Sequence, residues 1–294
     1  MNGKRVTFEF IEEQSENYPV TTIFKFINGV SRSGYYKWKK EKETRESQAE
    51  KDKPILNEMI VHYRIHGGNL GNERFKLILD QILDHPINVK RIRRMREQYN
   101  LPLLTKKRKP HRGFKEHVKV GNLLNRNFKA RRQGIKFSID ISYLEIKKPA
   151  SDFIFLCAIK DLFNNEIVAY KIGDYQDLDL VLDTVKLLKE KGPEKGAIIH
   201  SDQGSQFTSS LYMKELQNLQ FTQSMSRRGN CWDNACIESF FGKLKTEMPG
   251  FGQPETKEEM IEAVSNYIKY YNEIRPQLKL KMSPVQYRNN SVAA

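Results

Sequence analysis

The chain has 294 residues, of which 38% are hydrophobic and 29% are charged, and it carries a net charge of +14. This balance allows a buried core but excludes a membrane protein, because the apolar run at residues 153–159 falls far short of the roughly 20 residues that span a bilayer. Three cysteines are too few for a disulfide framework, and three glutamates within the first 13 residues exclude a secretory signal peptide. We therefore expect a cytoplasmic protein.

The positive charge is concentrated in one part of the chain. Residues 90–136 contain 17 lysines and arginines but only two acidic residues, so the rest of the sequence is close to neutral. A block of this kind is typical of a surface or arm that binds nucleic acid. The alternative is a solvated tail, but apolar and aromatic residues interrupt the basic block and indicate partial folding.

Residues 1–42 are predicted to form a helical region. Apolar residues recur at helical spacing over residues 7–28, Gly29 can end that segment, and Ser31 or Ser33 can cap a short helix that carries Tyr35, Tyr36 and Trp38. Helix, glycine-containing turn and helix give the outline of a helix-turn-helix, with the aromatic residues expected to pack rather than to stack on bases.

A second helical region is predicted over residues 43–105. Residues 41–52 alternate acids and bases, as in an exposed helix or linker, and three further helices follow, the last capped by Asn88. His62 and His66 are expected to be structural or solvent-facing, since no cysteine in this half could complete a His/Cys zinc site. The third helix is strongly basic and is the expected DNA-recognition helix; its basic residues are Lys90, Arg91, Arg93, Arg94 and Arg96. The alternative for this set is a solvated basic face.

Residues 106–133 are predicted to be a basic and mostly extended linker that ends in a short helix near Leu123, Leu124 and Phe128. A catalytic domain is expected over residues 134–294. Alternating apolar residues over 135–143 predict a strand with Asp140 on its polar side, and segments 153–159 and 166–172 continue as antiparallel strands. Helix, strand, helix, strand and helix follow, with the strands at 197–200 and 221–224. This order predicts an α/β fold with a mixed sheet and flanking helices.

Three acids stand at prominent places in this pattern. Asp140 lies within the first strand, Asp202 follows a buried strand, and Glu238 lies on a helix expected to start near Asn230 or Asp233. Hard divalent cations prefer carboxylate oxygens, and a pair of such ions can hold both the attacking and the leaving oxygen of a phosphoryl displacement. We therefore predict a site for Mg²⁺ or Mn²⁺, with two ions. His200 precedes Asp202 by two residues, and either assistance to this site or a packing role is open.

The spacing of the three acids, with 35 residues between Asp202 and Glu238, resembles that of DDE transposases and retroviral integrases. Three sequence motifs are similar to those of second-frame (OrfB-type) transposases of bacterial insertion sequences. They are HSDQGSQFTS, SMSRRGNCWDNACIESFFGKLKTE and YYNEIRPQLKLKMSPVQY. The chain departs from that pattern at Phe137 and Ile139, where tryptophan and threonine are usual.

The resemblance implies a ribonuclease-H-like core, with a helix-turn-helix-like region before it, that cleaves DNA at element ends and joins the freed 3′-hydroxyl to a second phosphodiester. It also implies partners: double-stranded DNA at the element ends and the target, further copies of the chain on DNA, and a first-frame (OrfA-type) product or a fusion with it. Lys245 is implied to touch DNA near the element end. Arg227 and Arg228 are expected to contact the DNA backbone, and the alternative is that they are ordinary basic side chains on the protein surface. The protein is expected at the bacterial nucleoid.

A rival interpretation is a non-catalytic DNA-binding regulator derived from a transposase. The three intact acids count against a decayed copy, although they do not separate an enzyme from a regulator made by the same element. A nuclease without strand transfer is a third possibility. The absence or presence of joined DNA products distinguishes it from a transposase.

Overall fold

The computed structural model describes residues 3–104, 123–124, 128–146, 152–226 and 234–292. The chain divides into two compact units, residues 1–60 and 61–294, which are described separately below. No helix in the described ranges is long and apolar enough to cross a membrane.

The first unit is helical and has a small aromatic core. It contains α1 (Gly3–Gln14), α2 (Val20–Ile23) and most of α3 (Arg32–Ile65). Ile11 and Tyr35 are fully buried, and Phe8 and Trp38 pack around them. Tyr35 and Trp38 therefore pack as predicted, whereas Tyr36 is exposed. Ser31 accepts a hydrogen bond from the Gly34 N–H at the start of this helix.

Helix α3 differs from the sequence prediction, which placed a short helix after Ser33 and a boundary between residues 42 and 43. The helix instead continues for 34 residues through that boundary and through Pro54. Alternating acids and bases lack an apolar stripe, but they supply side-chain pairs along the helix: Lys53 pairs with Glu50 at 2.5 Å, and Gln48 donates to Asp52 at 3.1 Å. Such pairs stabilise an exposed helix without a buried face.

The second unit begins with the end of α3, followed by α4 (Asn72–Ile82) and α5 (Val89–Gln98). The side chain of Asn88 accepts from the Lys90 N–H and caps α5, as predicted. Two glycines with positive φ, Gly67 and Gly68, turn the chain after α3. Gly67 packs backbone to backbone against Gly250, since a Cβ on Gly67 would lie 2.7 Å from the Gly250 carbonyl oxygen and a Cβ on Gly250 would meet that of Gly67.

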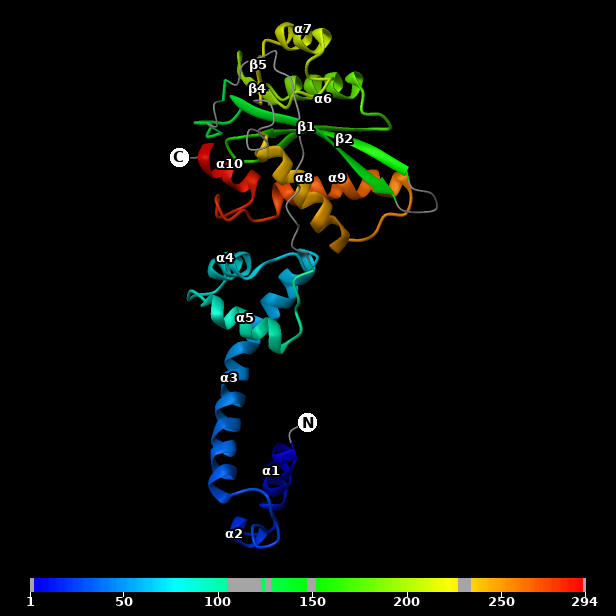
Figure 1. Ribbon diagram of the computed structural model, residues 1–294. Helices are drawn as coiled ribbons and strands as arrows, with labels where there is room; N and C mark the ends of the chain where they lie inside the picture. Colours follow the sequence, from blue (N-terminus) through cyan, green and yellow to red (C-terminus); the bar gives the residue numbers. More distant parts are fainter. Residues whose placement is uncertain (1–2, 105–122, 125–127, 147–151, 227–233, 293–294) are drawn as a thin grey trace. The chain divides into compact units, whose positions relative to one another are not determined.

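A five-stranded mixed sheet forms the centre of this unit, in the order β3-β2-β1-β4-β5 (Figure 1). Its strands are β1 (Lys136–Ile146), β2 (Asp152–Asp161), β3 (Ile167–Gly173), β4 (Ile198–Ser201) and β5 (Thr222–Met225). The first three are antiparallel, as predicted, whereas β4 runs parallel to both β1 and β5. This is the strand arrangement of the ribonuclease-H-like fold.

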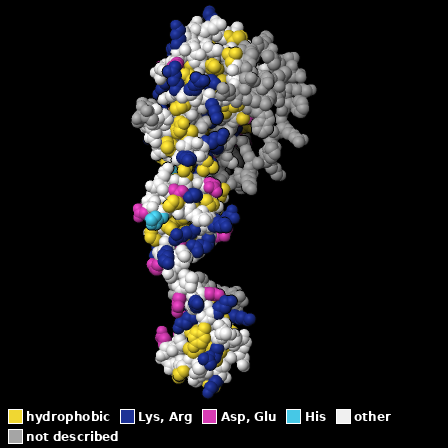
Figure 2. Space-filling model, turned by 90° about the vertical axis from the view of Figure 1, so that its left-hand side faces the viewer, with side chains coloured by type: hydrophobic (Ala, Val, Ile, Leu, Met, Phe, Trp, Pro, Cys, Tyr) yellow, Lys and Arg dark blue, Asp and Glu magenta, His cyan; other side chains and the backbone are white. Residues whose placement is uncertain are grey.

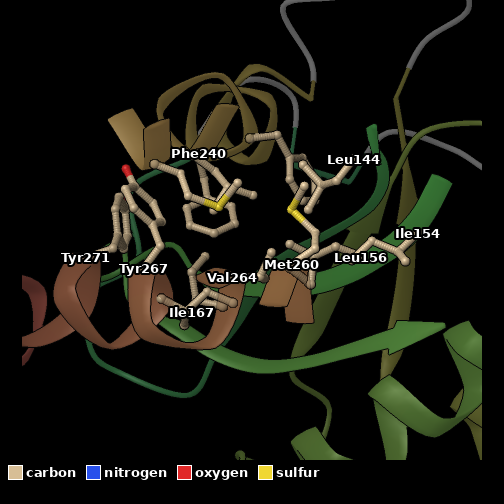
Figure 3. Packing of buried hydrophobic residues seen from close by; sticks show 14 of the residues in the cluster. Leu144, Ile154, Leu156, Ile167, Phe240, Met260, Val264, Tyr267 and Tyr271 are labelled. Atoms are coloured by element: carbon tan, nitrogen blue, oxygen red, sulfur yellow. The ribbon is translucent and has the colours of Figure 1, made fainter. Parts of the chain in front are cut away.

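Helices cover both faces of the sheet (Figure 1). On one face α6 (Leu178–Glu190), which is capped by Asp177, and α7 (Ser210–Asn218) pack on apolar side chains that include Ile139 of β1 and Ile159 of β2. On the other, α8 (Ala235–Glu247) and α9 (Lys257–Glu273) pack on Leu144, Leu156 and their neighbours (Figure 3). The even-numbered residues of β1 share one face of the sheet. Those near the start of the strand, Ser138 and Asp140, are polar, and those near its end, Leu144 and Ile146, belong to the hydrophobic core.

Two predicted details need correction or fall outside the described residues. The described part of α8 begins at Ala235, and Asn230 and Asp233 lie outside the described ranges. The predicted short helix is wrong for residues 123, 124 and 128, which are not helical; Leu124 is buried, and the Leu123 N–H donates to Ser224 Oγ at 3.0 Å instead of to a helical carbonyl. Helix α10 (Pro284–Val292) follows the short η2 (Met248–Gly250) and α9.

Candidate active site

Two of the three acids are brought together by the pairing of β1 with β4. The parallel register places Ser138 beside His200. Continued by two residues, it places Asp140 beside Asp202, which directly follows β4. Glu238 lies in the first turn of α8, the helix that covers the same face of the sheet as Asp140. The central strand, its parallel neighbour and one helix therefore supply the three carboxylates.

The three carboxylates act on one another electrostatically. Burial, followed by repulsion from Asp202 and Glu238, raises the pKa of Asp140 to about 8. Burial and then Asp202 raise the pKa of Glu238, and burial raises the pKa of Asp202. Repulsion of this kind is expected where like charges share a site, and a divalent cation would relieve it.

The chemistry of these side chains fits a hard divalent cation. Asp140 Oδ1 accepts from the Ile141 N–H at 2.8 Å and Asp202 Oδ1 accepts from the Gly204 N–H at 2.9 Å. Within the described chain, neither these two acids nor Glu238 forms an ion pair with a basic side chain. Across the same described ranges, no three His, Cys, Asp or Glu side chains are gathered closely enough to enclose one ion. Glu238 is the exposed member of the three.

Buried polar contacts fix the start of α8 against the sheet. Ser138 Oγ donates to Asn234 Oδ1 at 3.1 Å, just before the helix, and both residues are buried. Lys160 of β2, only 3% exposed, donates to the Cys236 carbonyl oxygen at 2.9 Å. These contacts position Glu238. Lys160 cannot be recognised from the sequence, because a lone lysine in a strand pattern carries no signal of its partner.

His200 has a structural role in this arrangement. Its ring is fully buried, with Nδ1 2.9 Å from Ser224 Oγ and Nε2 3.2 Å from Ser226 Oγ. Ser224 lies in β5 and Ser226 directly follows it, so the histidine ties β4 to the neighbouring strand. Of the two roles left open by the sequence, the hydrogen-bonding one is confirmed.

The predicted DNA-contact residues lie in several different environments. Lys245 of α8 lies with its Nζ 4.2 Å from the centre of the exposed Tyr143 ring, and its charge opposes the rise in the Asp140 pKa. Arg227 and Arg228 lie outside the described residues. On α5, Lys90, Arg93 and Arg94 are exposed and Arg91 is half-buried.

Arg96 is a correction to the predicted set. Its side chain is buried, Nε donates to the Leu101 carbonyl oxygen at 2.8 Å, and Nη1 donates to that of Leu70 at 2.8 Å. It also lies over the Phe75 ring. The guanidinium is held by the backbone around α4 and α5, so Arg96 is removed from the expected DNA contacts.

A second charged cluster, at the far end of α8, was not predicted. Glu247 is buried and accepts two hydrogen bonds of 2.6 Å from the buried Arg275, and a third from Tyr267 at 3.0 Å. Arg74 of α4 lies 3.7 Å from the same carboxylate. Nearby, His66 Nδ1 lies 2.9 Å from the Tyr270 hydroxyl, so this histidine is structural, as expected.

A mixed sheet of this order, with acids on its central strand, after its parallel neighbour and on the covering helix, defines the class of polynucleotidyl transferases that cut and join DNA. The integrase core domain model matches residues 130–231, and a second integrase core domain model matches residues 238–292. InsK of insertion sequence element IS150 from Escherichia coli is 31% identical over 96% of this chain and 97% of its own length.

Two further relatives extend this match. An insertion element IS600 protein of Shigella sonnei is 30% identical over 89% of this chain and 96% of its own, and the transposase InsF of IS3A from Escherichia coli is 26% identical over 97% and 99%. Among solved structures, the magnesium complex of the HTLV-2 integrase catalytic core has 12% identity, a TM-score of 0.41, and coverage of 54% of this chain and 98% of its own; a likeness of that size adds nothing to the assignment. The chain belongs to the insertion-sequence transposases with an integrase core domain.

Proposed function

We propose that Asp140, Asp202 and Glu238 are the metal-binding residues of a DNA strand-cleavage and strand-transfer site. The observation that carries this proposal is the mutual repulsion of three carboxylates that have no basic ion-pair partner among the described residues. Uncompensated acids on a rigid sheet and helix are costly to the fold, and such cost is typical of functional sites.

The ions that these residues would hold are Mg²⁺ or Mn²⁺, two per site. When bound, they supply Lewis-acid stabilisation of the phosphoryl oxygens and of the attacking and leaving oxygens. The chain's own contribution is positional: β1 and β4 fix two ligands, and Asn234 and Lys160 fix the start of the helix that carries the third. None of the three acids attacks the DNA, so no covalent enzyme–DNA intermediate forms.

The reaction that follows has two displacements at phosphorus. Water attacks the phosphodiester at an element end and its 3′-oxygen leaves, taking up a proton as a 3′-hydroxyl. That hydroxyl then attacks a second phosphodiester, whose own 3′-oxygen leaves. The number of phosphodiester bonds is conserved in the second step, which needs no energy source.

DNA binding in this proposal uses basic residues of the second unit. These are the exposed Lys90, Arg93 and Arg94 and the half-buried Arg91 of α5 and the half-buried Lys245 of α8, with Arg227 and Arg228 added from the sequence. On the face that Figure 2 presents, basic side chains outnumber acidic ones. The substrates are double-stranded element ends and target DNA at the nucleoid. Further copies of the chain and a first-frame product are the expected protein partners.

The test is Asp202→Asn, which keeps the shape of the side chain and removes its charge. Both cleavage and joining of element-end DNA should be lost while DNA affinity is unchanged, and Mn²⁺ should raise the melting temperature of the wild type but not that of the variant. Normal strand transfer by the variant contradicts the metal model. A wild-type protein that binds ends but never cleaves them supports the non-catalytic regulator instead.

A further inference from the structure

A cavity of about 730 Å³ lies beside α8 and is lined by basic side chains. Its lining includes Ser239 and Lys243 of α8, Lys160 of β2, and Lys279 after α9. Arg74 and Arg275 also reach it, but both are engaged with Glu247. No acidic residue is among the described residues that line the cavity.

The three lysines lack acidic partners. Within the described ranges, none of Lys160, Lys243 and Lys279 forms an ion pair. Lys160 donates to the Cys236 carbonyl oxygen at 2.9 Å and Lys243 donates to Ser239 Oγ at 2.8 Å, and both of these oxygens are neutral. Burial, and then repulsion from Lys160 and Arg275, lowers the pKa of Lys243 to about 7. The folded chain thus gathers positive charge here without neutralising it.

An unpaired donor points to the same conclusion. Gln277 lines the cavity, is 9% exposed, and its side-chain nitrogen is buried without a hydrogen-bond partner in the described structure. A buried donor without an acceptor costs free energy, so such groups in native proteins usually meet a ligand or water. Lysine ammonium groups and an amide N–H₂ are all donors, and the complementary ligand must bring acceptor oxygens with negative charge.

We propose that this cavity binds one backbone phosphate of the DNA substrate, next to the phosphate that reacts. The proposal rests on the proposed function, since it takes DNA to lie across the three acids. Ser239, on the cavity wall, directly follows Glu238. Lys160 pairs across the sheet with Ser138, on the same face of β1 as Asp140 and two residues from it. A strand held at the acids therefore runs within reach of the cavity.

The experiment measures the affinity of element-end duplex for the full chain as a function of salt. Each phosphate contact contributes about 0.9 to the slope of log affinity against log salt. We expect Lys243→Gln/Lys279→Gln to reduce this slope by about one phosphate contact and to weaken binding several-fold at low salt. Lys243→Arg/Lys279→Arg, which keeps both charges, should retain the wild-type slope.

Two exposed lysines elsewhere provide a control of equal charge. Lys195→Gln/Lys214→Gln removes two charges from the segment before β4 and from α7, and it should leave the slope unchanged. Lys160 is left intact because it is buried and supports α8. Since Lys243 is repelled by its neighbours, its replacement should not lower the melting temperature, which verifies that the variant is folded.

Three results would overturn the proposal. If the Gln pair keeps the wild-type slope while the wild type still cleaves ends, the cavity holds no DNA phosphate and the proposed function stands. If the control pair loses as much slope, the effect is one of net charge. If inorganic pyrophosphate raises the melting temperature of the wild type but not of the Gln pair, and the DNA slope is unchanged, the ligand is a free phosphate anion. Failure of the proposed function has another signature: no metal-dependent cleavage by the wild type.

Discussion

The two ends of α8 place the same side chain in opposite surroundings. Near the start, Glu238 is exposed beside Asp140 and Asp202, and burial together with Asp202 raises its pKa. At the end, burial opposes the charge of Glu247, but hydrogen bonds and attraction from Arg275 outweigh it and lower its pKa. Among the described residues Glu238 has no basic ion-pair partner, whereas Glu247 is paired with Arg275.

This difference separates a residue kept for chemistry from a residue kept for the fold. An acid that the fold leaves uncompensated is available to a ligand, whereas an acid with a bidentate arginine and a tyrosine has no remaining capacity to bind one. Position on a common helix therefore does not decide the role of a carboxylate. Its partners decide it, and four substitutions test the comparison.

The largest effect is expected from Glu238→Gln. Since loss of an outer-shell partner of a metal site costs up to about 100-fold, loss of a ligand should reduce strand cleavage by more than about 100-fold. The melting temperature of the metal-free protein should stay the same or rise, because one repelling charge is removed. Cleavage of a labelled element-end duplex and a thermal melt measure the two quantities. A variant that cleaves normally would place Glu238 outside the site.

Glu247→Gln should show the reverse behaviour. Removing one partner of a buried ion pair costs about 3–5 kcal/mol, because Arg275 is left buried and uncompensated. Urea unfolding measures this loss. The double variant Glu247→Gln/Arg275→Met should recover part of it, because the stranded charge is gone. If Glu247→Gln is as stable as the wild type, the pair does not hold this end of the helix.

A smaller effect on stability is expected when the pH is lowered, because of His66. Burial, followed by repulsion from His62, lowers the pKa of this histidine from 6.5 to about 4. Between pH 6.5 and 4 the unfolded chain binds a proton at this histidine and the folded chain does not. The stability that is present above pH 6.5 is therefore lost as the pH falls towards 4. The loss amounts to about 3 kcal/mol. His66→Gln should flatten this part of the stability curve, and parallel curves for the two proteins would contradict the prediction.

The smallest effect on stability is expected when the pH is raised, because of Lys243. Its pKa is lowered from 10.5 to about 7 by burial and by Lys160, Arg275 and Arg74, with Glu247 acting in the opposite direction. The unfolded chain therefore holds more protons between pH 7 and 10.5, and stability should rise with pH in that window. Because the side chain is only partly buried, we expect about 1 kcal/mol or less. Lys243→Met should remove the rise, as melts at pH 7 and pH 9 would show.

The sequence was most informative where a local pattern decides the structure. Alternation over 135–143 predicted the first strand and the face of Asp140, and the cap at Asn88 was correct because a cap depends on its immediate neighbours. That Asp202 and Asp140 serve one site was suggested by their shared carboxylate chemistry and by the family resemblance.

Features made by distant contacts could not be predicted in this way. Glu247 and Arg275 are separated by 28 positions and resemble ordinary surface charges in sequence, as does Arg96. Residues 41–52 were predicted as an exposed helix or a linker, because a charged segment without an apolar stripe fits both, and the structure has the helix. Which charged residues become buried depends on tertiary packing, and no local sequence motif reports that packing.

The contact between Gly67 and Gly250 restricts how this protein can change over time. Most tight contacts can be relieved by a smaller partner, so that a substitution at one position is rescued by a second. Here each Cβ would meet the other residue's carbonyl oxygen, and a smaller side chain at the nearby Asn69 would not relieve that clash with the backbone. We expect the two glycines to lack compensating substitutions, so that in a library of random variants each is retained independently of what happens at the other.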